Sequence, residues 1–461
     1  MALPSLSVAG AAGDGSGTYL VRFKGKGIPA DFASRVGALG GEVVFAHAGV
    51  GIAAVSGLDD ASATSIAARG DVAAVDPDMV VELEPMVGGV EQVVAEPTSP
   101  ADPASALRFS RQWNMKTIQA DLAWAAGKTG SETVRVGILD TGIDYLHPDL
   151  VGRVDLGASR SFLSAAENAR VQAAFPGAHE IADLNYHGTH VAATVASNAY
   201  IYAGVTSQVK LVGLKVCSPG TAANGFRGSC PSSGTFAAIL YAADIGLPVI
   251  NLSLGGRWNR RDASARGGFG PSFIATINQV MSYAERKGTT VVVSAGNDAI
   301  DIDHDGNGYK TYCSAPNTVC VSATGPVSQA SADGPWQDID ALADYSNYGR
   351  SAISVAAPGG NRVSVTAACS GFTIHPSLLV CRNRHFNSPT DWSAFSVGLS
   401  GTSMAAPHTS GVAALIASEG ITSPSRIRAR LQQSADDLGQ PGVDPAYGKG
   451  RINAARAVGL D

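Results

Sequence analysis

The chain has 461 residues, a length that alone allows about three domains of ordinary size. Hydrophobic residues make up 45% of it and charged residues 16%, which is typical of a folded chain with a sizeable core. No apolar run approaches the roughly 18 residues of a transmembrane helix. The formal charge of −6 supplies no basic field for nucleic acid. We therefore expect a globular protein with neither a membrane nor a nucleic acid as its partner.

The first 17 residues lack the basic start and apolar core of a signal peptide. We interpret them as the remainder after a leader was removed and replaced by Met1. Residues 18–83 then read in order as a strand at 19–23, a helix at 31–39 and strands at 42–46 and 50–55. A helix that Asp59 and Asp60 cap runs to residue 68, and a strand follows at 72–75. This order, βαββαβ, predicts a small α+β, ferredoxin-like domain.

Residues 84–107 have the composition of an acidic, proline-rich linker. Its prolines stand at positions 85, 97, 100 and 103. Residues 1–107 hold 5 basic and 13 acidic side chains, a net −8, and the other 28 basic and 26 acidic side chains give the remainder +2. The acidity of the chain therefore belongs to its first quarter.

From residue 108 onward the pattern is that of an α/β domain. Apolar runs typical of buried strands lie at 134–139, 209–216, 249–254, 290–295, 319–323 and 353–356. Predicted helices lie at 188–197, 235–245, 273–286, 403–418 and 424–434. Such strands with helices between them predict a parallel sheet that is covered on both faces. Ligands of such sheets bind at the carboxyl ends of the strands.

Six cysteines fall in three close pairs along the chain. The pairs are Cys217/Cys230, Cys313/Cys320 and Cys369/Cys381. An even number with local pairing predicts disulfides and an oxidising compartment, although six cysteines allow 15 connectivities and neighbour pairing is only the simplest. Six reduced thiols are the alternative. The chain has no Cys-x-x-Cys unit that would indicate a zinc site.

Three motifs carry the side chains of an acyl-transfer site. An apolar strand ends at Asp140, in Asp-Thr-Gly, which places a carboxylate at the predicted carboxyl edge of the sheet. His187 opens a helix in His-Gly-Thr-His, and Ser403 begins another in Gly-Thr-Ser-Met-Ala. Each motif alone has another explanation. Asp-Thr-Gly is also typical of a turn, His-Gly-Thr-His of a core or metal-binding histidine, and a serine beside glycine of a helix cap. Together they supply the three parts of a catalytic triad.

These motifs resemble those of the subtilisin-like serine proteases, in the order Asp, His, Ser. The resemblance covers residues 108–461 and includes the segments 147–150, 251–255 and 448–453. Residues 18–83 resemble the inhibitory propeptide of such proteases. The resemblance implies a subtilisin-like three-layer α/β fold and a secreted serine endopeptidase made as a self-inhibited proenzyme. It also implies polypeptide substrates, the chain's own propeptide as intramolecular inhibitor, no organic cofactor and a monomer.

The triad chemistry assigns a role to each motif. His187 would take the proton of Ser403, and Asp140 would orient the imidazole and stabilise its charged form. Asn297, which matches the family's Ala-Gly-Asn element, and the Ser403 N–H would bind the oxyanion. We expect packing roles for His190 and His408.

The family resemblance also implies where a substrate lies. Its backbone would pair as an added strand beside Ser253, Leu254 and Gly255. Ala295 and Gly296 would form the facing wall of the primary pocket. The insertions at 221–231 and 257–271 would either rim the cleft or be surface loops.

A run of acidic residues suggests structural calcium. Asp301, Asp303 and Asp305 alternate before Gly306, as in the first half of a calcium loop. Tyr312 stands where the loop's bidentate glutamate is expected, so a hydrated acidic turn is the alternative.

Two other functions would use the same fold. One is a binding protein that has lost catalysis, against which the intact triad argues. The other is an intracellular maturation protease of narrow specificity, against which the paired cysteines argue.

Overall fold

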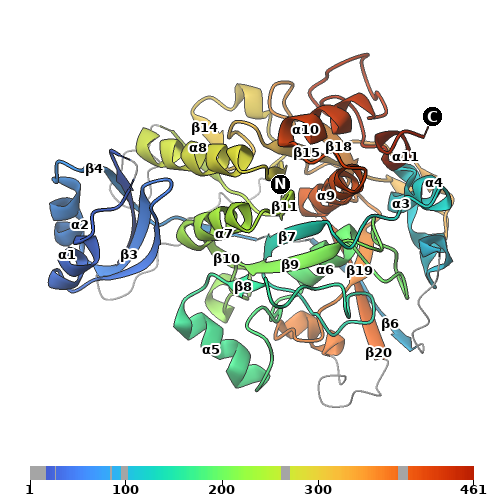
Figure 1. Ribbon diagram of the computed structural model, residues 1–461. Coiled ribbons are helices and arrows are strands. Elements are labelled where there is room, and N and C mark those ends of the chain that lie inside the picture. Colours follow the sequence, from blue (N-terminus) through green and yellow to red (C-terminus); the bar gives the residue numbers. More distant parts are fainter. Residues whose placement is uncertain are drawn as a thin grey trace.

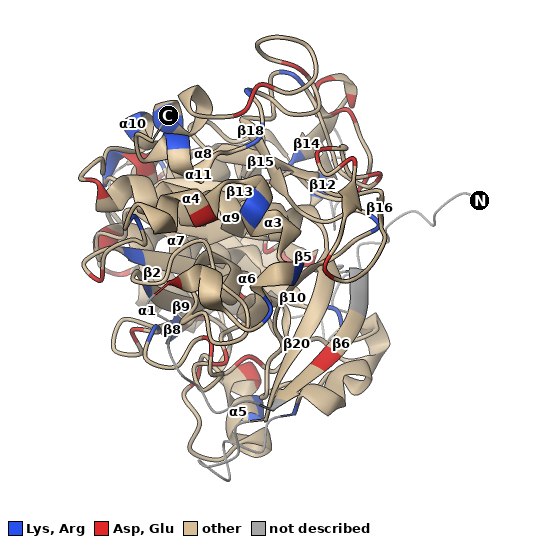
Figure 2. Ribbon diagram, turned by 90° about the vertical axis from the view of Figure 1, so that its right-hand side faces the viewer, with Lys and Arg blue, Asp and Glu red and all other residues tan. Residues whose placement is uncertain are grey.

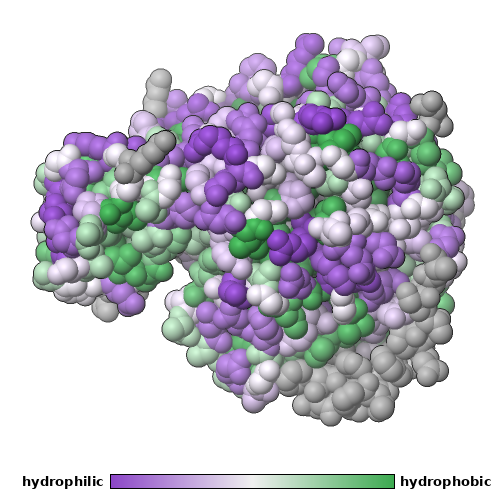
Figure 3. All heavy atoms as spheres, viewed as in Figure 1, coloured by the Kyte–Doolittle hydropathy of each residue, from purple (hydrophilic) through white to green (hydrophobic). Residues whose placement is uncertain are grey.

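The structure is a computed structural model, and it describes residues 17–25, 27–83, 86–94, 102–260, 270–382 and 393–460. Figure 1 shows a small N-terminal domain beside a large domain that contains the rest of the chain. The small domain stands out from the side of the large one, and apolar and polar residues are mixed over the face drawn in Figure 3.

The N-terminal domain has the predicted βαββαβ order. Its elements are β1 (Gly17–Phe23), α1 (Phe32–Ala38), β2 (Glu42–His47), β3 (Ile52–Leu58), α2 (Asp60–Ala67) and β4 (Val72–Pro77). The strands form an antiparallel sheet in the order β2-β3-β1-β4. The Asp59 carboxylate caps α2 by accepting the Ser62 N–H at 2.8 Å. Buried side chains such as Val21, Phe32 and Ile66 give this domain a core of its own.

A parallel seven-stranded sheet forms the centre of the large domain. In spatial order its strands are β18 (Val355–Pro358), β15 (Val319–Thr324), β13 (Thr290–Ser294), β11 (Val249–Leu252), β7 (Arg135–Asp140), β9 (Lys210–Lys215) and β8 (Arg160–Ser161). Every neighbouring pair is parallel. All six predicted strands belong to this sheet. The seventh, β8, has only two residues and gave no apolar run.

Helices cover both faces of this sheet and make three layers (Figure 1). On one face α6 (His187–Val195) and α9 (Thr402–Ser418) pack against side chains such as Val136 and Ile138. On the other, α7 (Ser232–Asp244) and α8 (Pro271–Arg286) pack against Leu139 and Ile250. The remaining helices are α3 (Trp113–Thr117), α4 (Ala120–Ala125), α5 (Ala165–Ala174), α10 (Pro424–Gln433) and α11 (Ala454–Ala457). The predicted parallel sheet with helices on both faces is therefore confirmed.

Part of the expected linker is a strand, which corrects the interpretation of residues 84–107. Strand β6 (Met86–Val94) pairs antiparallel with β20 (Ser393–Ser400), which pairs in turn with β19 (Val365–Ala368). Both views place β6 and β20 side by side (Figures 1 and 2). The Glu91 carboxylate binds Arg108 and Arg111, each at 3.0 Å, and the Tyr202 hydroxyl at 3.1 Å. The strand partner β20 is about 300 residues away, so the local acidic composition concealed the strand. Residues 95–101 lie outside the described chain.

All three predicted disulfides form, and together they use all six cysteines of the sequence. Cys217 follows β9, and Cys230 lies in β10 (Ser229–Pro231), so the first bridge ties the insertion that holds β10 to the carboxyl end of β9. Figure 2 shows acidic and basic residues interspersed over the face that it presents. Within the described chain, no helix is long and apolar enough to cross a membrane.

Candidate active site

Asp140 and His187 form a buried pair at the carboxyl edge of the sheet. Asp140 is the last residue of β7, and His187 is the first residue of α6. The His187 Nδ1 lies 2.8 Å from the Asp140 Oδ1, and the two side chains are 1% and 0% exposed. The same carboxylate oxygen accepts the Thr141 N–H at 2.8 Å, which fixes its orientation. The carboxylate thus holds one ring nitrogen, and the other nitrogen points away from it.

The charges around His187 favour its protonated form. Burial opposes the imidazolium, but the charge and hydrogen bond of Asp140, together with the charge of Asp183, outweigh burial and raise the pKa of His187. A raised pKa makes the ring a stronger base for a serine hydroxyl.

Asp183 is a residue that the motif reading missed. It is fully buried, and it accepts hydrogen bonds from the hydroxyls of Thr141 (2.8 Å) and Thr189 (2.6 Å). Burial raises the pKa of Asp183 despite these hydrogen bonds. Its bonds tie the turn after Asp140 to the helix that carries His187. The signal available in the sequence was an acidic residue four positions before the motif histidine.

Ser403 is the second residue of α9, and its side chain faces Ser253, in the segment predicted to pair with substrate. Its hydroxyl donates to the Ser253 carbonyl at 3.1 Å, so among the described residues its hydrogen bond goes to Ser253 and not to His187. The Ser253 hydroxyl donates to the Ser403 carbonyl at 2.7 Å and accepts the Asn251 amide at 2.9 Å. These bonds join the start of α9 to the end of β11. Hydrogen bonds of a triad are often absent before substrate binds.

Two N–H donors converge beside Ser403. The Asn297 Oδ1 accepts both the backbone N–H (2.9 Å) and the hydroxyl (2.8 Å) of Thr402, which leaves the Nδ2 group as the donor. A Cβ placed on Gly401 would lie 3.3 Å from that Nδ2 and 3.7 Å from the Ser403 nitrogen. The small space that Gly401 leaves open is therefore one that both donors can reach.

A segment from the N-terminal domain pairs beside this site. Strand β5 (Val80–Glu82) lies antiparallel to β10, with Val81 opposite Cys230. The Leu83 N–H continues the pairing by donating to the Gly228 carbonyl at 2.7 Å. A Cβ on Gly228 would meet both the Leu83 side chain (2.9 Å) and the Thr141 methyl (3.2 Å), so the segment reaches the residue next to Asp140. The reading of the sequence left open whether the insertion holding β10 rims the cleft.

Comparison with known proteins agrees with this geometry. Residues 131–450 match the family Peptidase S8, the Subtilase family. The chain belongs to the subtilase family. A thermophilic serine proteinase of Bacillus sp. (strain AK1) is 32% identical over 350 residues, which cover 75% of this chain and 67% of the relative. Thermitase of Thermoactinomyces vulgaris is 32% identical over 359 residues, which cover 76% of this chain and 96% of thermitase.

Solved structures share the fold of this subtilase. The epidermin leader peptide processing serine protease of Staphylococcus aureus has a TM-score of 0.67 at 21% identity and covers 96% of this chain and 98% of its own. Fervidolysin of Fervidobacterium pennivorans, a keratinolytic enzyme related to subtilisin, has a TM-score of 0.67 at 23% identity. The match covers 97% of this chain and 62% of fervidolysin. The predicted family is confirmed, and the chain is a serine endopeptidase of a family that needs no organic cofactor.

The predicted calcium ligands of this subtilase do not converge. Asp301 binds its own turn and His304, Asp303 accepts the Ser351 hydroxyl at 2.6 Å, and Asp305 pairs with Arg257. Within the described ranges, no group of three His, Cys, Asp or Glu side chains could hold a metal ion. The acidic loop as it stands does not fit calcium, because protein donors already occupy each carboxylate.

The other two motif histidines lie in the core. The His190 Nε2 lies 3.1 Å from the Val365 carbonyl, and the His408 Nε2 lies 2.8 Å from the Asn114 Nδ2. Burial lowers the pKa of His190 to about 3 and that of His408 to about 4. Both rings are therefore neutral packing groups at ordinary pH.

Proposed function

We propose that this subtilase is a secreted, monomeric endopeptidase that cuts polypeptides with Asp140, His187 and Ser403 and is made as a self-inhibited proenzyme. The observation that carries the proposal is the buried Asp140–His187 hydrogen bond of 2.8 Å, at the edge where Ser403 and two oxyanion donors also lie.

In the first step His187 removes the proton of the Ser403 hydroxyl as that oxygen attacks the peptide carbonyl. Asp140 keeps a proton on Nδ1, so that Nε2 is the base, and it stabilises the imidazolium that forms. The oxyanion receives hydrogen bonds from the Asn297 amide and the Ser403 N–H. His187 then gives its proton to the leaving amine, which leaves an acyl group on Ser403. Water hydrolyses that ester by the same route, with His187 again as the base.

Substrate enters as an added strand between the Ser253–Gly255 segment and β10. The pairing of β5 with β10 supports this placement, because β5 is itself an extended chain on that edge. The Ser253 carbonyl, which now accepts the Ser403 hydroxyl, would instead accept an N–H of the substrate. Binding of substrate thus frees the hydroxyl to turn toward His187.

The N-terminal domain serves as the inhibitor, because its β5 occupies the strand position that a substrate needs. The Asp78 carboxylate accepts the Ser233 N–H at the start of α7 at 2.9 Å, and the His47 ring lies 2.9 Å from the Asp244 carboxylate. We place the activating cut near residues 81–86, with the later part of 84–107 as the other position. The domains are then 18–83 (inhibitor), 84–107 (linker with β6) and 108–461 (enzyme).

The proposed export rests on the three disulfides, since disulfides persist mainly in oxidising compartments. Thiol counting with and without reductant tests this point. An intracellular maturation protease would instead show six free thiols and cut few proteins.

Replacement of Ser403 by Ala tests the catalytic assignment. The variant should leave its own precursor uncut and hydrolyse no casein, and a fluorophosphonate probe should label the wild-type protein and not the variant. Undiminished casein hydrolysis by the variant would refute the triad. Failure of the probe to label folded, processed wild-type protein would indicate a binding protein of the same fold.

A further inference from the structure

A lysine is buried at the wall of the proposed primary pocket. We propose that Lys310 determines specificity there and selects substrates with glutamate or aspartate at the scissile residue, meaning the residue whose carbonyl Ser403 attacks. The inference rests on the proposed function, because it takes the Ser253–Gly255 segment and the Ala295–Gly296 segment as the two pocket walls.

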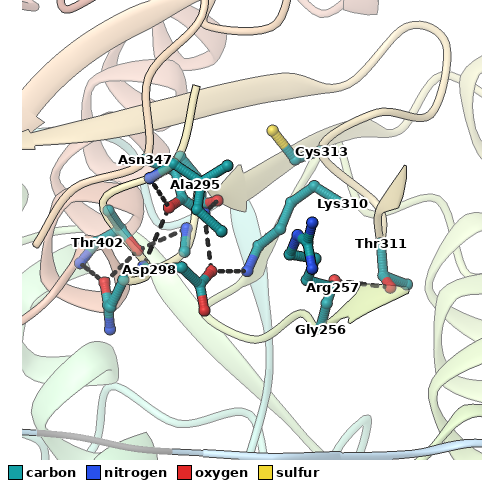
Figure 4. Close-up of polar contacts among 12 residues, drawn as sticks. Gly256, Arg257, Ala295, Asp298, Lys310, Thr311, Cys313, Asn347 and Thr402 are labelled. Atoms are coloured by element: carbon teal, nitrogen blue, oxygen red, sulfur yellow. Dashed lines mark hydrogen bonds and ion pairs between the residues drawn. The ribbon is translucent and has the colours of Figure 1, made fainter. Parts of the chain in front are cut away.

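Lys310 is attached to one wall and reaches the other (Figure 4). Strand β14 (Gly308–Lys310) pairs antiparallel with β12 (Arg257–Asn259), which directly continues the first wall, and the Thr311 N–H donates to the Gly256 carbonyl at 2.9 Å. The lysine side chain crosses to the second wall, where a Cβ on Gly296 would lie 2.0 Å from its Nζ. Gly296 has a φ of +97°, so glycine is favoured there by both backbone and space.

The ammonium group is buried with a single anionic partner. The Lys310 side chain is 6% exposed, and its Nζ donates to the Asp298 Oδ2 at 3.0 Å. An ammonium has three N–H donors, and among the described residues Asp298 is the one acceptor within hydrogen-bond distance. Two donors therefore stay available beside the Ala295–Gly296 wall.

The other charges nearby are already paired. The Asp298 Oδ2 also accepts the Asn347 amide at 3.0 Å. Burial alone would raise the pKa of Asp298, but the charge of Lys310 and the hydrogen bonds from Asn347 and Lys310 outweigh burial and lower it. Arg257 is bound to Asp305, with Nε and Oδ2 2.6 Å apart. Lys310 and Arg257 thus already neutralise the charges of Asp298 and Asp305, whereas Lys310 can still donate.

These contacts rank the possible substrates. A glutamate or aspartate carboxylate would accept the unused donors in charge-assisted hydrogen bonds. A leucine would leave them unsatisfied, and a lysine or arginine would bring a second cation against a buried one. The sequence has a glutamate, Glu84, directly after Leu83 and within the range 81–86 proposed for the activating cut, so the chain itself offers a glutamate there. Glu84 lies outside the described residues.

The test uses quenched-fluorescence peptides that are identical except for Glu, Gln, Leu, Lys, Ala or Gly at the scissile residue. The processed wild-type enzyme should cleave the Glu peptide with a kcat/KM about tenfold or more above that for Gln, the size of one charge-assisted hydrogen bond, and should cleave the Lys peptide least. Lys310→Met should bring the Glu and Gln values within about threefold of each other while the Leu peptide is still cleaved. Lys449→Met, at an exposed lysine in neither wall, should keep the wild-type ranking.

A second variant keeps the test decisive if Lys310→Met does not fold. Asp298→Asn removes the competing carboxylate and leaves Lys310 in place, so it should raise the Glu-to-Gln ratio. Equal cleavage of the Glu and Gln peptides by wild type, or a ratio that neither variant changes, would overturn the inference. So would cleavage confined to peptides with Ala or Gly at this residue, which would mean that Lys310 only fills the pocket. If the wild-type enzyme cleaved neither casein nor any of the peptides, the proposed function itself would be refuted.

Discussion

The disulfide between Cys217 and Cys230 should stabilise both the fold and the bound substrate. The two cysteines are 13 residues apart, so the bridge closes a loop of 14 residues. The chain-entropy relation gives about 3 kcal/mol for such a loop. Cys230 lies in the middle of β10, and the Cys217 N–H binds the carbonyl of Asp140 at 3.2 Å. Removal of the bridge should therefore loosen β10, which is proposed to pair with the substrate, as well as lower the free energy of unfolding.

The bridge between Cys369 and Cys381 is a matched control. Its cysteines are 12 residues apart, so the same relation again gives about 3 kcal/mol, but neither cysteine lies in β10 or directly beside it in sequence. Each pair would be replaced by alanine. Denaturant unfolding would be measured in the Ser403→Ala background to prevent self-digestion, and peptide kinetics would be measured in the active background.

Both double variants should lose about 3 kcal/mol of unfolding free energy, and only Cys217→Ala/Cys230→Ala should show a raised KM. An equal rise of KM in both variants would refute the link between this bridge and the substrate strand. An unchanged unfolding free energy in both would refute the loop-entropy argument.

Three further predictions concern single side chains. Asn297→Ala should lower kcat by about 100- to 1000-fold with little change in KM, because it removes one oxyanion donor; stopped-assay kinetics on a peptide check this, and a loss below threefold would contradict the oxyanion role. Asp183→Asn should move the acid limb of the pH profile of kcat/KM to lower pH, because the Asp183 charge helps to raise the pKa of His187, which acts as a base only when neutral; an unmoved limb in the folded variant would contradict this. Burial raises the pKa of Asp78 to about 6, so a proton is held more strongly in the complex than in the free N-terminal domain. That domain should accordingly bind the processed enzyme most tightly below about pH 4, and its affinity should fall on the order of 100-fold as pH rises through 6. Titration calorimetry at several pH values checks this. An affinity that rises over this range would contradict it.

The parts of the molecule that could be predicted are those with a local signal. The buried strands read as apolar runs, and Asp140, His187 and Ser403 each stand in a compact motif at the end of a strand or the start of a helix. What was missed depends on partners distant in sequence. The pairing of β6 with β20 joins segments about 300 residues apart. The proposed role of Lys310 depends on the fold, which brings its Nζ against Gly296.

Because β6 pairs with β20, the position of the proposed activating cut decides whether β20 keeps both of its neighbouring strands. In that sheet β20 is the central strand, with β19 on one side and β6 on the other. A cut near residues 81–86 leaves β6 on the enzyme as its new amino-terminal strand, and β20 stays paired on both sides. A cut beyond Val94 would free β6 and leave a row of unpaired backbone groups along β20. Such an open edge is a template for self-association, so we expect the earlier of the two proposed cuts to yield an enzyme that remains monodisperse at high concentration.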